Sequence, residues 1–149
     1  GRLALDIGRL AAEKAPPDRL LVRIGKRYLE LALAARSLSI HRLVIAEAAR
    51  TAGLGAEIYR TGPAQLVAAL AAYLQGEPAL QIENPRLAAE QFLGMVLGHA
   101  QLRLLLGAAP PQKVRGEIDQ LVEHAVAIFL RGTQVKDGKR PLAQSAAGR

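Results

Sequence analysis

The stretch NPRLAAEQFLGMVLGHAQLRLLLG, residues 84–107, decides the fold class of this chain. It opens on Asn84 and Pro85, a pair typical of a helix start. The Asn side chain can accept a hydrogen bond from a free backbone amide, and Pro has no amide to leave unpaired. The helix that follows is apolar nearly all round, so other helices must cover most of its sides. It is too short and carries too many polar residues to span a membrane.

Outside this stretch the composition is also that of a helical protein. The 149-residue chain is 50% hydrophobic, with only two Phe, three Tyr and no Trp, and most of its apolar residues are Leu and Ala. Leu and Ala favour helices. Gly and Pro divide the chain into helical segments with short joints, and no segment alternates as a strand would. We therefore predict one all-α domain of five or six helices.

The Pro residues at 16 and 17 mark the first boundary. Residues 1–15 are expected to be the end of a connecting helix, because they are helical in pattern from the first residue and stop at these prolines. Residues 16–131 form the predicted domain, in which Ser37 or Ser39 is expected to cap the helix near 39–50. Residues 132–149 lack hydrophobic periodicity, and we expect a flexible basic tail there.

Charge and missing residue types argue against several functions. The net charge is +7, but four basic residues and one acidic residue in the last 18 contribute +3 of it, and the other basic residues are scattered. Direct DNA binding by this chain is therefore not expected. The chain has no Cys, which fits a reducing cytoplasm. We find no nucleophile motif and no metal-ligand spacing, and predict neither catalytic residues nor a cofactor.

Two histidines fall within apolar helix faces. His41 lies in the middle of the apolar arc of residues 39–50, and His99 shares one side of its helix with Arg103. The ordinary interpretation of each is a core histidine satisfied by a carbonyl. However, a buried Arg needs a partner, so this side is expected to face Glu47, a polar cavity, or both. An apolar cavity with few polar groups is typical of a small-molecule site. The candidate ligand-binding residues are Tyr28, His41, Ile45, Tyr59, Phe92, Val96, His99 and Arg103.

A second set of residues is expected at an interface. The last helix, near 114–131, is amphipathic, and its apolar stripe is expected at a surface or an interface. Gly94 and Gly98, four residues apart, predict a close helix approach that serves either a subunit contact or internal packing. The candidate interface residues are Leu87, Gln91, Gly94, Gly98, Leu105, Ile118, Leu121, Val122, Ala125 and Phe129.

Three blocks, in order, resemble one family. IHRLVIAEAAR (40–50), EIYRTGPAQLVAALAAYL (57–74) and the stretch 84–107 resemble the C-terminal ligand-binding and dimerisation domain of TetR/AcrR-type transcriptional regulators, in particular the AefR-like branch. The resemblance covers residues 17–131. It implies a homodimer joined by a four-helix bundle and a pocket for a small apolar or amphipathic effector. No segment resembles the family's N-terminal helix-turn-helix domain, so operator DNA is expected to be bound only through that domain.

The expected function is therefore effector sensing and dimerisation within a cytoplasmic transcriptional regulator. The resemblance also implies that Arg103 and His99 would suit an acidic or phenolic head group of the effector. The alternative is a stand-alone helical module that binds a small molecule or lipid and has no role in DNA binding.

Overall fold

The computed structural model describes residues 2–135, and this part of the chain is all-α, as predicted. Its one pairing of extended residues is an isolated bridge between Leu80 and Gln134. It contains more helices than the five or six expected, because Gly62 separates one short helix from its neighbour and Pro110 and Pro111 start another. The eight helices are α1 (Arg2–Ala12), α2 (Pro17–Ala32), α3 (Ala35–Ala48), α4 (Leu54–Thr61), α5 (Pro63–Gly76), α6 (Pro85–Leu105), α7 (Pro111–Gly116) and α8 (Ile118–Thr133).

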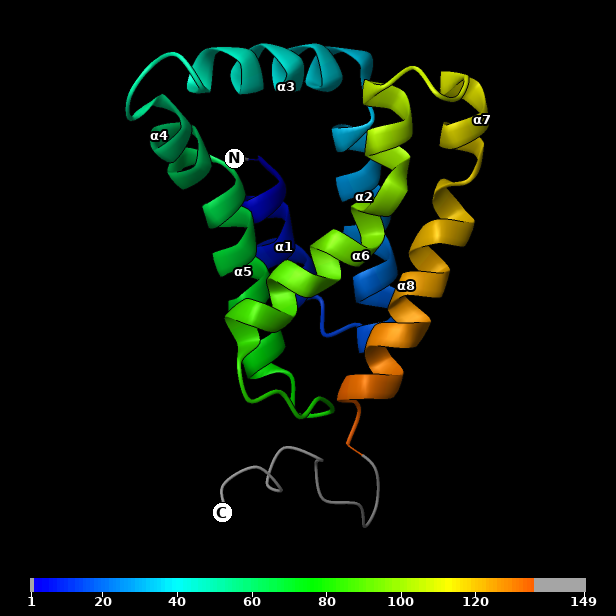
Figure 1. The fold of residues 1–149 in the computed structure, drawn as a ribbon. Coiled ribbons are helices and arrows are strands. Elements are labelled where there is room, and N and C mark those ends of the chain that lie inside the picture. The colour runs from blue at the N-terminus through cyan, green and yellow to red at the C-terminus, as the bar shows by residue number, and fades with distance from the viewer. Residues whose placement is uncertain (1, 136–149) are drawn as a thin grey trace, which may run out of the picture.

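The helices form two packed groups that α6 joins. Helices α1 and α5 pack on each other, α2 packs on α8, and α6 crosses between the groups and contacts α5, α2 and α8 (Figure 1). Helix α3 lies across one end of the molecule and leads from α2 to α4 (Figure 1). No helix in residues 2–135 has the length and apolar character needed to cross a membrane.

The core lies along α2, which is buried against α6 and α8. Leu21, Ile24 and Leu29 of α2 have no exposed surface, and burying such a side chain contributes about 1.5–3 kcal/mol. Gly25 on the same helix allows a close approach, because an added Cβ atom would lie 2.7 Å from a methyl carbon of Val122 in α8. Any larger residue at position 25 would require the Val122 side chain or one of the helices to shift.

Polar contacts at the surface join the same elements. Lys26 of α2 contacts Asp119 at 3.0 Å and Glu123 at 3.2 Å, both in α8, and the hydrogen bond to Asp119 is the main cause that raises the Lys26 pKa. At the other end of α8, the amide of Gln81 donates to the Thr133 carbonyl at 2.7 Å. Helix α8 ends at Thr133, two residues later than expected, because Gln134 is extended. Of the predicted tail, residues 136–149 lie outside the described residues.

One of the two predicted helix caps is confirmed. The Asn84 side chain accepts a hydrogen bond from the Leu87 amide at 3.0 Å, and Pro85 is the first residue of α6. The prediction that Ser37 or Ser39 caps α3 is wrong. Helix α3 already begins at Ala35, and no side chain caps it. Its start is set instead by the turn at Leu33, whose side chain is fully buried.

Candidate functional site

Helix α3 spans the end of the molecule and buries few of its side chains. Leu38 near its start is its one buried residue, and Ala48 at its other end packs near Gly55 of α4. Between these points Leu43 is 61% exposed and Ile45 is 58% exposed, whereas His41 and Val44 are half-buried. A helix with so few buried residues in its middle bridges open space rather than covering a solid core.

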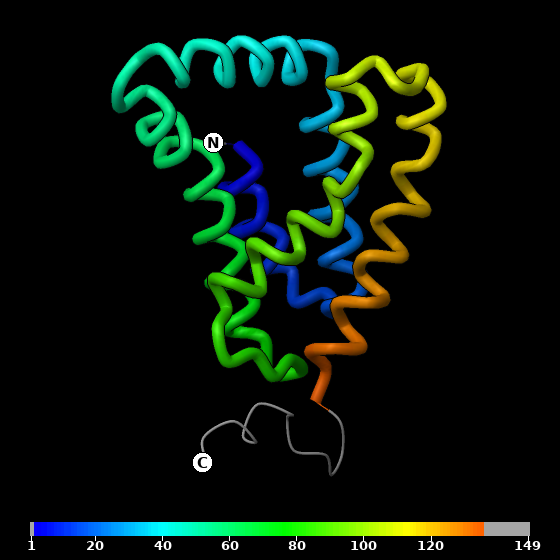
Figure 2. The backbone as a smooth tube through the Cα atoms, viewed as in Figure 1, coloured from blue at the N-terminus to red at the C-terminus, as the bar shows by residue number. Residues whose placement is uncertain are grey.

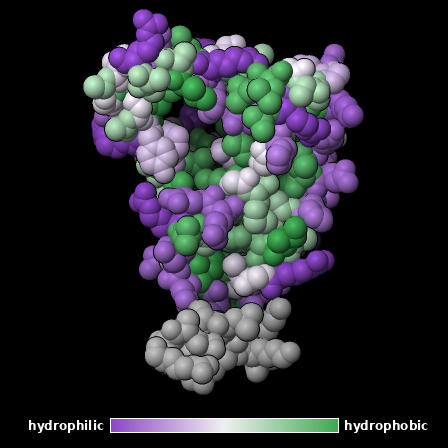
Figure 3. Space-filling model, in the orientation of Figure 1, coloured by the Kyte–Doolittle hydropathy of each residue, from purple (hydrophilic) through white to green (hydrophobic). Residues whose placement is uncertain are grey.

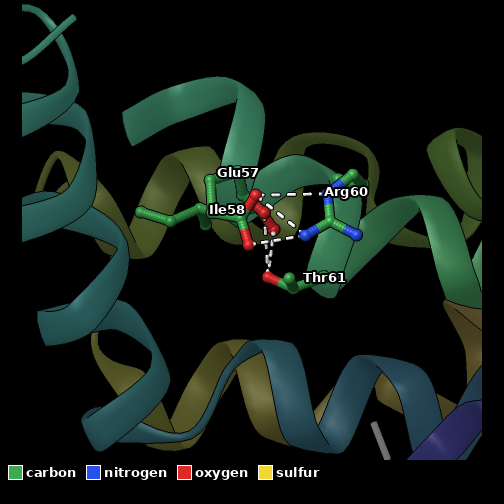
Figure 4. Close-up of polar contacts among 4 residues, drawn as sticks. All are labelled: Glu57, Ile58, Arg60 and Thr61. Carbon is green, nitrogen blue, oxygen red and sulfur yellow. Dashed lines mark hydrogen bonds and ion pairs between the residues drawn. The ribbon is translucent and has the colours of Figure 1, made fainter. Parts of the chain in front are cut away.

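Helix α4, which continues from α3, is also weakly attached. It has no buried residue, and the polar contacts shown in Figure 4 all lie within the helix. Arg60 binds both carboxylate oxygens of Glu57, with a shortest distance of 2.7 Å, and the Thr61 hydroxyl donates to the Glu57 carbonyl at 2.9 Å. Such local contacts stabilise α4 itself but do not fix it to the rest of the molecule.

The surface below α3 is hollowed, and apolar side chains lie within the hollow (Figure 3). Of the predicted ligand-binding residues, His41 lies on the half-buried stripe of α3 with Val44 and Ala48. Tyr28 of α2 packs against the core, and burial raises the pKa of its hydroxyl. Tyr59 of α4 is about half exposed. Ile45 was expected beside His41 in the apolar arc, but the structure leaves it exposed.

Helix α6 bends at Gly98, and the bend changes which residues share a side. Gly98 has φ 42° and ψ −140°, which is not helical, and the tube in Figure 2 changes direction within α6. This conformation is accessible to glycine and strained for other residues. An added Cβ atom at Gly98 or at Gly94 would meet nothing within 4 Å. Within the subunit, therefore, a glycine is needed at position 98 for the backbone bend and not for close helix packing.

The bend separates the four α6 residues that were predicted to share one side. Phe92 and Val96, before the bend, are buried in the core. Phe92 makes an edge contact with Phe129 of α8, with ring centres 5.1 Å apart. His99, directly after the bend, is exposed. The prediction that Phe92, Val96, His99 and Arg103 share one side of α6 is therefore wrong, because it assumes a straight helix.

Arg103 has an acidic partner, but the partner is Glu117 and not Glu47. Both terminal nitrogens of Arg103 donate to the Glu117 carboxylate, one of them at 3.3 Å, and both side chains are about 30% exposed. The hydrogen bond from Arg103 is the main cause that lowers the pKa of Glu117. Glu117 directly precedes α8, so this ion pair connects the second half of α6 to the start of α8. Glu47 is exposed on α3.

The structure divides the predicted interface residues into two sets. Four residues of α8 are buried within the subunit, because its apolar stripe packs on α2 and α6: Ile118, Val122, Ala125 and Phe129. The other six retain exposed or half-exposed surface: Leu87, Gln91, Gly94, Gly98, Leu105 and Leu121.

Beside them, α6 and α8 expose apolar residues that the sequence pattern did not single out. Leu102 of α6 and Ile128 of α8 are each 47% exposed. Met95, Leu121, His124 and Ile128 line a groove of about 440 Å³ between the two helices. Figure 3 shows apolar side chains over this part of the molecule. We call the surface formed by Met95, Leu121 and Ile128 the α6/α8 face.

Comparison with known proteins identifies the family to which the chain belongs. Residues 19–132 match the C-terminal domain of AefR-like transcriptional repressors. The chain belongs to this AefR-like family. A solved structure, described as a putative TetR-family transcriptional regulator from Mesorhizobium loti, has the same fold. It superposes with a TM-score of 0.75 at 21% sequence identity, over 90% of this chain and 69% of that one. No curated protein matches the sequence.

Membership places the AefR-like domain within a transcriptional regulator, which is not an enzyme class. TetR-family regulators act as dimers and bind DNA through an N-terminal domain. Within residues 2–135, no group of three His, Asp or Glu side chains is placed to hold a metal ion.

The AefR-like domain has a further concave site that the sequence did not predict. A groove of about 580 Å³ lies where the first turns of α3, the end of α6 and α7 meet, and its lining includes Arg42 and Arg115. The scattered positions of these arginines in the sequence gave no signal, because helices distant in sequence bring them together.

Proposed function

We propose that residues 16–131 are the effector-sensing and dimerisation domain of a transcriptional repressor, and that a small apolar or amphipathic effector enters the hollow below α3. The structure of α3 is the observation that carries this proposal. The helix buries a single residue and lies over a hollow that contains apolar side chains. Ligand-binding segments are commonly drawn from such weakly held parts of a fold.

The polar groups predicted to bind the effector suit an amphipathic ligand. His41 lies on the half-buried stripe of α3, and its ring can donate or accept a hydrogen bond. Tyr28 and Tyr59 bring hydroxyls from α2 and α4, and His99 follows the bend of α6. A few polar groups within an apolar lining fix the orientation of a ligand, whose burial supplies most of the affinity.

Helix α6 provides the connection from the effector to the rest of the repressor. Helix α3 contacts α6, and Arg42 of α3 donates to the carbonyls of Leu104 and Leu105 at the end of α6. Arg103 then joins this half of α6 to α8. An effector that prefers one position of α3 shifts the population of α6 arrangements, and a coupling of about 1–3 kcal/mol changes operator affinity about 5- to 150-fold. Operator DNA is bound by the N-terminal domain of the full-length protein.

We further propose that a second copy of the chain covers the α6/α8 face, so that four helices form the dimer bundle. The face exposes apolar side chains from two neighbouring helices along a groove, and symmetric pairing of one such face is the commonest form of dimer. Gly94 is exposed and open on α6, which permits a close approach of the partner helix.

A thermal-shift screen of small apolar and amphipathic compounds tests the effector site. At 100 times its Kd, a ligand stabilises the domain by about 2.7 kcal/mol, which is roughly 5–10 °C in Tm at this size. We expect His41→Ala to abolish most of the shift while Glu47→Ala, on the exposed side of α3, retains it. Equal loss in both variants, or a shift that neither variant changes, would contradict the placement of the effector below α3.

A further inference from the structure

The groove between α3, α6 and α7 has the size and lining of a small-molecule site. Its volume of about 580 Å³ lies in the range of about 300–1,000 Å³ that is usual for such sites. Leu38, Leu104, Pro110 and Pro111 give it apolar walls. None of the eight residues predicted to bind the effector lines it, so it is separate from the site proposed above.

Two guanidinium groups give the groove a positive charge. Arg42 donates from one nitrogen to the Leu104 carbonyl at 2.9 Å, and Arg115 donates from one nitrogen to the Leu33 carbonyl at 3.4 Å. Each guanidinium has five N–H donors, so these contacts leave others available. No Asp or Glu lines the groove, and neither arginine is in an ion pair within residues 2–135.

The start of α3 adds a third positive element. Ala35, Leu38 and Ser39 from its first turns line the groove, and no side chain caps the helix at Ala34. The first amides of a helix have no partner within the helix. Together with the helix dipole they favour an anion at this end.

Helix capping is the alternative explanation of the two arginines. Arg42 neutralises the carbonyl end of α6, and Arg115 that of α2, which stabilises both helices. Capping accounts for one nitrogen of each side chain. Capping does not explain why the groove has apolar walls and no acidic residue. It also does not explain why the uncapped first turn of α3 lines the same groove.

We propose that this groove binds a small amphipathic anion, with its carboxylate held by Arg42, Arg115 and the first amides of α3. The apolar part of the ligand lies along Leu38, Leu104 and the two prolines. Because the groove adjoins the end of α6, its occupant draws the Arg42 guanidinium toward the ligand and fixes α3 against α7. This site is separate in place from the hollow below α3, and the two share Arg42 as their connection to the end of α6.

A set of three ligands with the same chain tests the charge requirement on the wild-type protein. Decanoate, 1-decanol and decyltrimethylammonium are titrated by calorimetry below the concentrations at which they form micelles, and amide shifts in NMR spectra map the site. We expect decanoate to bind at least about tenfold more tightly than 1-decanol, because charge-assisted hydrogen bonds are among the stronger ones. Its shifts should concentrate at the start of α3 and in α7.

Matched variants then test the two arginines. Arg42→Gln and Arg115→Gln should each weaken decanoate binding about tenfold or more, and Arg42→Lys should weaken it less. Arg19→Gln, which removes the same charge from an exposed site near the start of α2, should leave it unchanged. Similar affinity for decanoate and 1-decanol, no decanoate binding, equal effects of Arg19→Gln, or shifts confined to the hollow below α3 would each overturn the proposal. The dimer and the effector site would be unaffected by that result.

Discussion

Replacement of Gly98 by Ala tests whether the bend in α6 is required by the fold. At φ 42° and ψ −140° an L-residue is strained, and holding one in such a conformation costs about 1–3 kcal/mol. No atom within 4 Å obstructs the new methyl group, so the cost is conformational and not steric. We therefore expect Gly98→Ala to lower Tm by about 2–12 °C, at about 2–4 °C per kcal/mol for a chain of this size.

Gly8→Ala is the matched control, because Gly8 lies in helical α1, is exposed and also has nothing within 4 Å of an added Cβ. Ala is favoured over Gly in a helix by about 0.5–1 kcal/mol, so Gly8→Ala should raise Tm. Both variants are compared with wild type by calorimetry at one protein concentration, because dimerisation makes Tm depend on concentration. If Gly98→Ala raises Tm as Gly8→Ala does, α6 is straight in solution and the proposed connection through its second half fails.

Three further predictions concern packing, pH and local stability. Gly25→Val should destabilise the domain by about 1–3 kcal/mol in urea unfolding, since overpacking against Val122 has few ways to relax; wild-type stability would contradict the close approach of α2 and α8. Arg103 lowers the pKa of Glu117 in the folded state below its ordinary value of 4.5. The ion pair therefore contributes its full stabilisation above pH 4.5 and loses it as the pH falls through the folded-state pKa of Glu117. Glu117→Gln should therefore flatten the loss of stability expected of wild type as the pH falls below 4.5, and an unchanged slope would exclude this ion pair as a cause. Amides of α3 and α4 should exchange with deuterium sooner than those of α2, because α3 buries one residue and α4 buries none. Equal protection of α3 and α2 would mean that α3 is part of the rigid core.

The helical fold could be predicted from the sequence because its signals are local. Leu and Ala content, the Gly and Pro breaks and the Asn84 cap each act within a few residues, and α6 does begin at Pro85. The start of α3 was missed because burial of Leu33 and Leu38, which depends on tertiary packing, overrides the preference of Ser for a cap position.

The site was harder to predict because helix periodicity gives the sides of a straight helix and no more. It placed His41 on the half-buried stripe of α3, but the bend at Gly98 separates His99 from Phe92 and Val96. Periodicity also predicts an apolar stripe, but it does not predict whether the same subunit or a partner packs against that stripe. On α8 most of that stripe packs within the subunit, and the surface left for a partner combines Leu121 of the stripe with Ile128, which stands outside it.

Partner residues distant in sequence have no local signal at all. Both terminal nitrogens of Arg103 pair with Glu117, but the sequence gives no sign of this partner, because the turn through α7 brings the two side chains together.

Sedimentation velocity of the purified chain at micromolar concentration tests the central claim most directly, which is that two copies pair through the α6/α8 face. The account predicts a species of twice the 15.9 kDa chain mass. It also predicts that Ile128→Arg converts this species to monomer, while Leu5→Arg, at an exposed apolar position of α1, does not. A wild-type monomer, or a dimer that Ile128→Arg leaves intact, would contradict it.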